Sequence, residues 1–306
     1  MKILITGATG FVGKKLVSRL VEAQHSLVVI SRSAKRAEDH LQLPLKYYDW
    51  NPVYEEPPAL AFKGIDAVVN LLGEGIAKKR WSQAQKQAIH DSRIIGTKNL
   101  VSACHKYLNT PLAVFITASA IGYYPKKSNQ ILTEETGHGS DFLADVCFAW
   151  ERESLHMSTC ARHVTLRVGI VLGKGGGVLS KILVPFKFGL GGTMGSGKQW
   201  MSWIHVNDLV SMIEFSLNDA SMNGVYNAVA PHPVTNKEFA KSLGKVIKRP
   251  AFISVPAIVL KTMMGEMSTL VLDSQNIQSK KLKNTGFKFK YSFIHDALTE
   301  VCSTEL

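Results

Sequence analysis

The chain has 306 residues, of which 45% are hydrophobic and 20% are charged, values typical of a soluble globular enzyme that buries its own core. No apolar run approaches the roughly 18 residues of a membrane span, and Met1 leads directly into a strand and a glycine motif, so we expect neither a membrane partner nor a signal peptide. The net charge of +12 attracts anions, but the cations are scattered and not interleaved with aromatic residues, so we expect no nucleic-acid partner.

The cysteines and histidines predict no metal site. The four cysteines are widely spaced and form no CxxC pair, and the ten histidines show neither HxxxH nor HExxH spacing. Free thiols at such spacing are typical of a reducing compartment, so we expect a cytoplasmic protein without disulfides.

Short β-branched runs alternate with helical stretches in the first half of the chain. Residues 2–6 predict a buried strand, and apolar side chains recur at helical spacing from Phe11 to Ala23. Further strands are predicted at 27–31, 65–72, 113–118 and 164–171. Because strands alternate with helices, the predicted fold class is α/β, with a Rossmann-type doubly wound parallel sheet.

Polar residues mark the starts of three later helices. Ser82 with Gln85, and Thr235 with Glu238, have the spacing of a capping box and predict helices running on from them. Asp208 precedes another apolar periodic stretch, and we expect it to cap that helix.

Glycine-rich stretches at 175–177 and 189–197 predict loops where the sheet domain gives way to a less regular part. The segment 189–203 is expected to form a mobile lid over a substrate. The expected domains are an NADP-binding Rossmann domain over residues 1–172, with part of 202–230 returning to it, and a smaller, mainly helical lobe made of 173–201 and 231–306.

Three glycines, Gly7, Gly10 and Gly13, follow the first strand and open the first helix, which is the setting a dinucleotide fingerprint requires. The first allows a tight turn, the second a close approach of backbone N–H groups to a pyrophosphate, and the third close packing of the helix. The helix N-terminus adds partial positive charge. Thr9, Phe11 and Val12 complete the predicted phosphate-binding segment. A strand–turn–helix corner without a ligand is the alternative.

The end of the second strand predicts the choice of cofactor. An acidic residue there binds the ribose hydroxyls of NAD, whereas this chain has Ser31 and Arg32, followed by Lys35 and Arg36. A hydroxyl and a guanidinium suit a 2′-phosphate. We therefore expect NADP(H), with a solvated surface arginine as the alternative.

Several segments together resemble the atypical and extended short-chain dehydrogenase/reductases, and within them the NAD-dependent epimerase-like family. These are the glycine loop, Asn70-Leu71-Leu72-Gly73-Glu74, Arg80-Trp81, Ser92-Arg93-Ile94, residues 117–124, residues 166–173, and Trp203-Ile204-His205-Val206 with Asp208. The resemblance covers nearly the whole chain and is specific for fold and cofactor rather than for reaction. It also suggests a homodimer.

The resemblance implies further cofactor contacts. Leu71, Leu72 and Gly73 should line the adenosine-ribose side through their backbone, Arg93 should reach the cofactor from the long helix, and Val171 should lie near the nicotinamide. For Arg93 an exposed helix arginine is an equal alternative.

The catalytic pattern of the short-chain reductases is incomplete in this chain. Ser119 lies where their serine belongs, but the Tyr-x-x-x-Lys pair falls on Leu143 and Cys147 when Glu151 is taken as the acidic residue after the motif. Neither side chain can do the work of Tyr or Lys. Lys126 and Lys127 lie in a proline-containing polar stretch that predicts an exposed loop instead of a replacement lysine.

Three interpretations remain for the chemistry. Tyr123 acts as the acid while Ser119 orients the substrate oxygen, or water or Arg93 serves the proton step, or the protein binds NADP(H) without turnover. The first two describe an NADP(H)-dependent oxidoreductase or epimerase for a small hydroxyl or carbonyl compound, or by family analogy a nucleotide sugar. The third describes a regulator or assembly partner, as the label "cell division inhibitor" of bacterial family members suggests.

Overall fold

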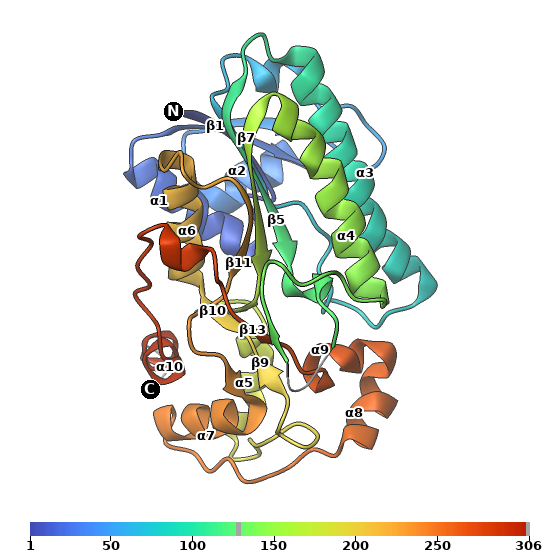
Figure 1. Cartoon of the computed structure of the whole chain (residues 1–306), viewed down its shortest axis with the longest axis vertical. Helices are drawn as coiled ribbons and strands as arrows, with labels where there is room; N and C mark the ends of the chain where they lie inside the picture. Colours follow the sequence, from blue (N-terminus) through green and yellow to red (C-terminus); the bar gives the residue numbers. More distant parts are fainter. Residues whose placement is uncertain (127–129, 304–306) are drawn as a thin grey trace.

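The computed structural model describes residues 1–126 and 130–303. Seven parallel strands form the main sheet in the order β3-β2-β1-β4-β5-β7-β11 (Figure 1). They are β1 (Lys2–Thr6), β2 (Ser26–Ser31), β3 (Lys46–Asp49), β4 (Ala67–Asn70), β5 (Leu112–Ala120), β7 (Ala161–Val168) and β11 (Gly224–Ala228). The strands after β1 are added toward one edge of the sheet as far as β3, and from β4 onward they are added toward the other edge. This change of order between β1 and β4 is typical of the Rossmann fold, so the predicted α/β Rossmann-type fold is confirmed.

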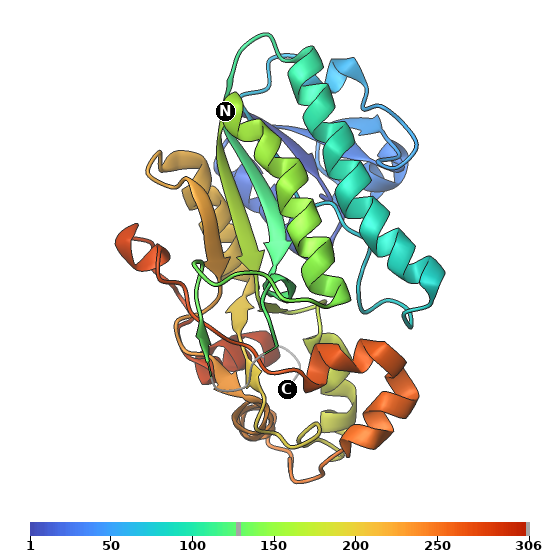
Figure 2. The same cartoon turned by 45° about the vertical axis from the view of Figure 1, so that its right-hand side comes forward.

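Helices cover both faces of this sheet (Figure 2). One face carries α1 (Phe11–Glu22), α2 (Ala34–Leu41) and α6 (Val206–Asn218), and the other carries α3 (Gln83–Tyr107) and α4 (Phe142–Leu155). Within β1, Ile3 and Ile5 belong to the hydrophobic core between the sheet and α1, α2 and α6, whereas Leu4 belongs to the core on the opposite face, under α3. Because side chains alternate along a strand, an unbroken apolar run is what a sheet covered on both faces requires.

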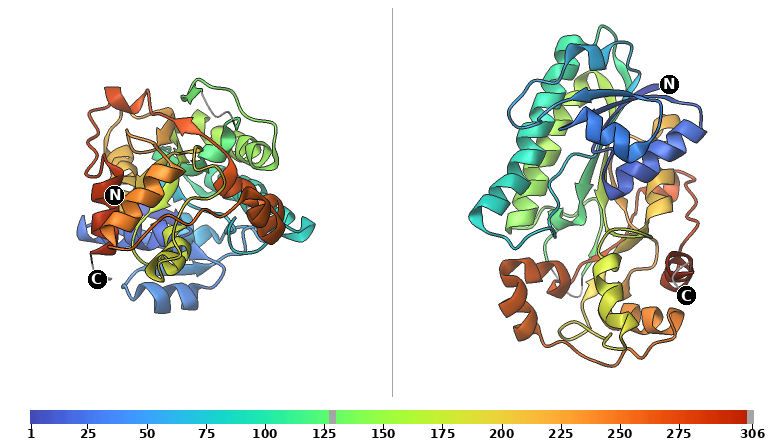
Figure 3. Two further views of the ribbon diagram at one scale, coloured as in Figure 1. Left: turned by 90° about the horizontal axis from the view of Figure 1, so that it is seen from below. Right: turned by 180° about the vertical axis from the view of Figure 1, so that it is seen from behind.

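A second unit lies at the carboxyl ends of the strands (Figure 3). Its elements are β8 (Ile170–Leu172), α5 (Leu179–Lys187), β9 (Trp200–Met201), β10 (Trp203–His205), β12 (Val234–Thr235), α7 (Asn236–Val246), α8 (Ala257–Met264), α9 (Thr269–Leu272) and α10 (Ile294–Cys302), with β6 (Ile131–Leu132) and β13 (Asn276–Ile277) paired beside it. Trp203, Phe239 and Leu298 lie in its own core. This smaller unit, called the lobe below, contacts the segments that follow β1 and β5: a Cβ atom on Gly176 would lie 2.3 Å from the Phe11 ring, and the Gln275 side chain donates to the Tyr124 carbonyl oxygen at 2.9 Å.

Two helix starts differ from the prediction. Asp208 does not cap α6: His205 is the cap and accepts the N–H of Asn207 at 3.2 Å. The Asp208 carboxylate instead accepts the N–H groups of Lys290 and Tyr291 at 2.8 and 3.0 Å, and so ties the C-terminal segment to the first turn of α6. A carboxylate in the first turn also favours the helix dipole, which explains why the sequence pattern was misread.

The predicted cap of α3 forms only in part: the Ser82 hydroxyl accepts the N–H of Gln85, but the Ser82 N–H donates to the Arg80 carbonyl oxygen at 2.9 Å instead of to the Gln85 side chain. The capping box of α7, between Thr235 and Glu238, is complete. In the part of the chain that the structure describes, no helix is both long and apolar enough to cross a membrane.

Candidate functional site

The glycine loop between β1 and α1 is too tightly packed for larger residues. Gly7 has φ of +67°, and a Cβ atom added to it would lie 2.4 Å from the carbonyl oxygen of Leu71. A Cβ atom on Gly13 would lie 2.2 Å from the Gly7 oxygen, since the first turn of α1 rests directly on the loop. The Gly10 N–H closes the turn on the Gly7 oxygen at 3.0 Å. These contacts give the physical reason for the glycine spacing.

The N-terminus of α1 is open to an anion. Its cap residue, Gly10, has no side chain to satisfy the first N–H groups, and the first turn holds no acidic residue. Thr9 and Gly10 are exposed, and Val12 is half-buried. The Phe11 ring packs against the glycine-rich loop of residues 175–177, since a Cβ atom on Gly176 would lie 2.3 Å from it. Uncapped N–H groups together with the helix dipole are the elements of a phosphate site.

The end of β2 presents a guanidinium without a carboxylate partner. Arg32 is exposed, and among the described residues its side chain forms no hydrogen bond or ion pair. Ser31 is half-buried beside it at the end of β2. Asp49, at the end of the neighbouring β3, accepts the N–H of Ala34 at 2.8 Å and thereby fixes the start of α2. The local arrangement suits a phosphate better than a pair of ribose hydroxyls.

The loop after β4 is held in place by buried polar groups. The Asn70 side chain accepts the Thr6 hydroxyl at 2.8 Å and donates to the Thr97 hydroxyl at 3.0 Å, while the N–H of Leu71 donates to Thr6 at 3.1 Å. Leu71 and Leu72 are half-buried and Gly73 is exposed. The loop therefore lies rigidly beside the glycine turn, as ligand loops at the carboxyl edge of such sheets do.

Arg93 lies directly against this loop. A Cβ atom on Gly73 would lie 2.7 Å from Arg93 Nη2, and Arg93 Nη1 donates to the carbonyl oxygens of Glu74 and Ile89 at 3.0 and 3.1 Å. The guanidinium also packs over the Trp150 ring, 5.2 Å from its centroid. Burial lowers the pKa of Arg93, and no carboxylate among the described residues bonds to it. This cation lacks a counter-ion at the edge of the candidate cofactor site.

A buried network joins the end of β5 to α4 and β7. Arg167 forms a bidentate ion pair with Glu151, at 2.8 and 2.7 Å, and donates to the Tyr124 hydroxyl at 2.8 Å. Tyr124 donates in turn to Asn227 Oδ1 at 2.7 Å, and Ser119 donates to Glu151 at 2.6 Å. Every member is hydrogen-bonded, which satisfies charges that would be costly to bury alone.

The network fixes the protonation of its members. Burial by itself would lower the pKa of Arg167, but its bonds to Glu151 outweigh this effect and raise the pKa. Burial raises the pKa of Tyr124 to about 12. Tyr123 is half-buried, and the Arg167 guanidinium lies 3.3 Å from the centroid of its ring. Among the described residues the Tyr123 hydroxyl forms no hydrogen bond, and its ring packs edge-on against Tyr124 and His138.

Leu143 and Cys147 occupy the side of α4 that faces β5. A Cβ atom on Gly122 would lie 3.3 Å from the Leu143 Cβ and 3.7 Å from the Cys147 Sγ. Burial raises the pKa of Cys147 to about 12, so its thiol is neutral near neutral pH. The positions expected for Tyr and Lys therefore hold an aliphatic side chain and an uncharged thiol, and neither exchanges protons readily.

The remaining predicted residues lie around the same edge. Val171 is half-buried on β8, opposite Ile204 of β10. Lys126 is exposed and forms an ion pair with Asp273 at 2.6 Å, and Lys127 lies outside the described residues. The network of Arg167, Tyr124 and Asn227 was not predicted from the sequence. Arg167, a charged residue within a strand that the sequence predicts to be buried, was the available signal, because such a residue requires a partner.

Comparison with known proteins gives matches along almost the entire chain. Residues 3–228 match the model of the NAD dependent epimerase/dehydratase family, and residues 255–301 match a domain of unknown function, DUF1731. The chloroplastic homologue of epimerase family protein SDR39U1 from Arabidopsis thaliana is 39% identical, over 98% of this chain and 86% of that protein. Epimerase family protein YfhF from Bacillus subtilis is 36% identical, over 98% of each chain.

Among solved structures, the crystal structure of human epimerase family protein SDR39U1, isoform 2, with NADPH superposes with a TM-score of 0.89. It is 30% identical to this chain, and the superposition covers 99% of each. A complex of MoeE5 with UDP-glucose and NAD has a TM-score of 0.80 at 19% identity, which shows a shared fold alone.

Proposed function

Because the chain belongs to the NAD dependent epimerase/dehydratase family, as its resemblance to the NAD-dependent epimerase-like reductases predicted, we propose that it binds NADP(H) and acts as an oxidoreductase or epimerase on a small hydroxyl or carbonyl compound. The observation that carries the proposal is the open N-terminus of α1 beside the unpaired Arg32. The human relative crystallised with NADPH supports the choice of cofactor. When bound, NADP(H) would supply hydride transfer.

The proposed cofactor contacts follow from the charges along this edge. Arg32 and Ser31 would hold the 2′-phosphate, and the first N–H groups of α1 would hold the diphosphate. Arg93, a cation without a carboxylate partner at Gly73, would gain a counter-ion from a phosphate. Three separate positive groups thus line one path, which supports a ligand with more than one phosphate group.

For the proton step we propose Tyr123. The Ser119 hydroxyl donates its proton to Glu151, so it is left to accept a hydrogen bond. A substrate oxygen that needs a donor would therefore take it from the free Tyr123 hydroxyl. The guanidinium of Arg167 lies 3.3 Å from the centroid of the Tyr123 ring, and this contact would hold the tyrosine in place beside Ser119 and Glu151.

A second candidate is a protein that binds NADP(H) without turnover, as a regulator or assembly partner. Leu143 and Cys147 favour this candidate, because they stand in place of the Tyr and Lys of the short-chain reductases and neither carries a charge near neutral pH. The two candidates share the cofactor site and differ only in what happens after binding.

Binding of NADPH and NADH, followed by cofactor fluorescence, tests the proposal. We expect NADPH to bind at least about tenfold more tightly than NADH, and Arg32→Ala to remove that preference by deleting a charge-assisted bond. Arg249→Ala is the matched control, since Arg249 is an exposed arginine of the lobe that, like Arg32, pairs with no described carboxylate. Oxidation of bound NADPH by a member of a panel of carbonyl compounds would identify an enzyme, and binding without oxidation would favour the regulator. No binding of either nucleotide would refute both candidates.

A further inference from the structure

The lobe carries positive charge with few acidic residues to balance it. Segments 173–201 and 239–265 contain nine lysines and arginines, four in the first and five in the second, and neither Asp nor Glu. The two segments lie side by side, because the N–H of Ile253 donates to the Gly191 oxygen at 3.2 Å and a second such bond follows two residues later. The charge is therefore concentrated on one connected part of the molecule.

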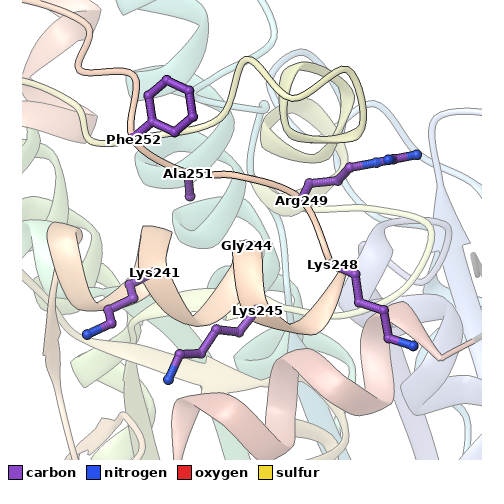
Figure 4. A pocket seen from close by; sticks show the side chains of 7 residues that line it. All are labelled: Lys241, Gly244, Lys245, Lys248, Arg249, Ala251 and Phe252. Carbon is purple, nitrogen blue, oxygen red and sulfur yellow. The ribbon is translucent and has the colours of Figure 1, made fainter.

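A hollow of about 410 Å³ lies between α7 and the segment after it (Figure 4). It is lined by Lys241, Gly244, Lys245, Lys248, Arg249, Ala251 and Phe252. All four of its cations are exposed, and within residues 1–126 and 130–303 their side chains form no hydrogen bond or ion pair. Four unpaired charges thus surround the hollow, and their side chains point outward from it in different directions (Figure 4).

The charge pattern on α7 does not stabilise the helix. Lys237, Lys241 and Lys245 follow one another at four-residue spacing, where like charges repel. The helix dipole favours Lys245 in the last turn but disfavours Lys237 in the first. An external anion along this row would turn the repulsion into attraction, so the pattern is better suited to binding than to stability.

Large apolar side chains are exposed beside these cations. Phe188, Leu190 and Phe252 are 77%, 60% and 80% exposed. A Cβ atom on Gly189 would lie 3.7 Å from Pro250 Cγ, so the two exposed stretches are neighbours. The chain continues into α8, an apolar helix with no buried residue, along the lower end of the molecule in Figure 1. Cations next to exposed aromatic and aliphatic groups are the chemistry of an interfacial membrane surface.

We propose that this lobe surface, formed by α7, residues 188–190 and residues 248–252, docks on an anionic lipid bilayer. The lysines contact headgroup phosphates while Phe188, Leu190 and Phe252 enter the interface. A second copy of the chain is a poorer occupant, because a self-complementary contact would set these cations against each other. The association is peripheral, and it departs from the expectation of no membrane partner drawn from the absence of apolar runs.

Sedimentation of the full chain with vesicles tests the proposal. Wild type should bind phosphatidylcholine vesicles that contain about 30% phosphatidylglycerol, and should not bind neutral ones. Because each cation near such a surface contributes about a fivefold factor, the triple variant Lys241→Gln, Lys245→Gln, Lys248→Gln should bind at least about tenfold more weakly. Glutamine suits the positive φ of Lys248, since Gln24 and Gln42 adopt the same conformation.

The matched control removes the same net charge from the sheet domain, through Lys46→Gln, Lys63→Gln and Lys98→Gln at exposed positions. It should keep binding within about twofold. Phe252→Ser, which keeps the charge, should weaken the binding that survives high salt. If both triple variants lost vesicle binding to the same extent, net charge alone would account for the binding, and the proposal would be overturned. Failure of wild type to bind, or binding of polyglutamate or single-stranded DNA in preference to vesicles, would overturn it too.

Discussion

The ion pair of Glu151 and Arg167 should be among the most expensive interactions in the protein to break. Their side chains are 12% and 5% exposed, and two bonds of 2.8 and 2.7 Å join them. In Glu151→Leu the guanidinium would stay buried in β7 with the neutral Tyr124 hydroxyl as its partner. Breaking one side of a buried pair typically costs about 3–5 kcal/mol, and we expect that loss in the free energy of unfolding.

A double-mutant cycle measured by urea unfolding separates the pair from its surroundings. Arg167→Met should also cost about 3 kcal/mol, whereas the double variant should cost less than either single change, because no unpaired charge remains buried. Lys35→Ala is the control: its partner Asp39 and Lys35 itself are 61% and 76% exposed, so the loss should stay below about 0.5 kcal/mol. A Glu151→Leu loss below about 1 kcal/mol, or additive single losses, would refute the reasoning.

Three further changes have effects that the structure predicts. Gly13→Ala should weaken NADPH binding at least about tenfold and lower the melting temperature, because its Cβ would lie 2.2 Å from the Gly7 oxygen; unchanged binding in a fluorescence titration would contradict this. Burial lowers the pKa of His163 to about 4, so the unfolded chain binds more protons than the folded one below pH about 6.5. Wild type should therefore lose about 2 kcal/mol of stability from this group between pH of about 7.5 and 5, and His163→Gln should not, as urea unfolding at both pH values would reveal. Thr235→Ala should cost about 1 kcal/mol in thermal unfolding by removing the cap that Glu238 completes, and a loss equal to that of an exposed Thr→Ala change elsewhere would argue against the cap.

The sheet domain could be predicted because its signals are local. β1 spans residues 2–6 as predicted, and α1 begins at Phe11 as the spacing of its apolar residues indicates. A strand, a glycine turn and a helix in direct succession leave one arrangement for the chain. The arrangement of the lobe was harder to predict from the sequence. Its core is assembled from segments far apart in the chain, such as those of Trp203 and Leu298, and no local sequence pattern indicates contacts between them.

The interior of the candidate site could be predicted only in part. Ser119 was identified by its position in a motif. Its hydrogen-bond partner Glu151 lies 32 residues away, and from the sequence it served only to locate the positions of the missing Tyr and Lys. Asp208 was misplaced for a related reason: its carboxylate caps no helix but binds two N–H groups 82 and 83 residues along the chain. Polar side chains identify the need for a partner, whereas the fold alone decides which partner is near.

The pairing of charged groups in the candidate site limits which side chains can serve the proton step. Glu151 and Arg167 pair with each other, and burial raises the pKa of Cys147 so that its thiol is uncharged near neutral pH; none of the three therefore offers an unpaired charge to a substrate. Arg32 and Arg93, which pair with no carboxylate among the described residues, favour an anion, and the Tyr123 hydroxyl is the donor that we propose for the proton step. Tyr123→Phe should therefore leave NADPH affinity within about twofold and abolish cofactor oxidation. If oxidation persists in that variant, the proton must come from water or Arg93, and the tyrosine is an aromatic wall that packs on Arg167.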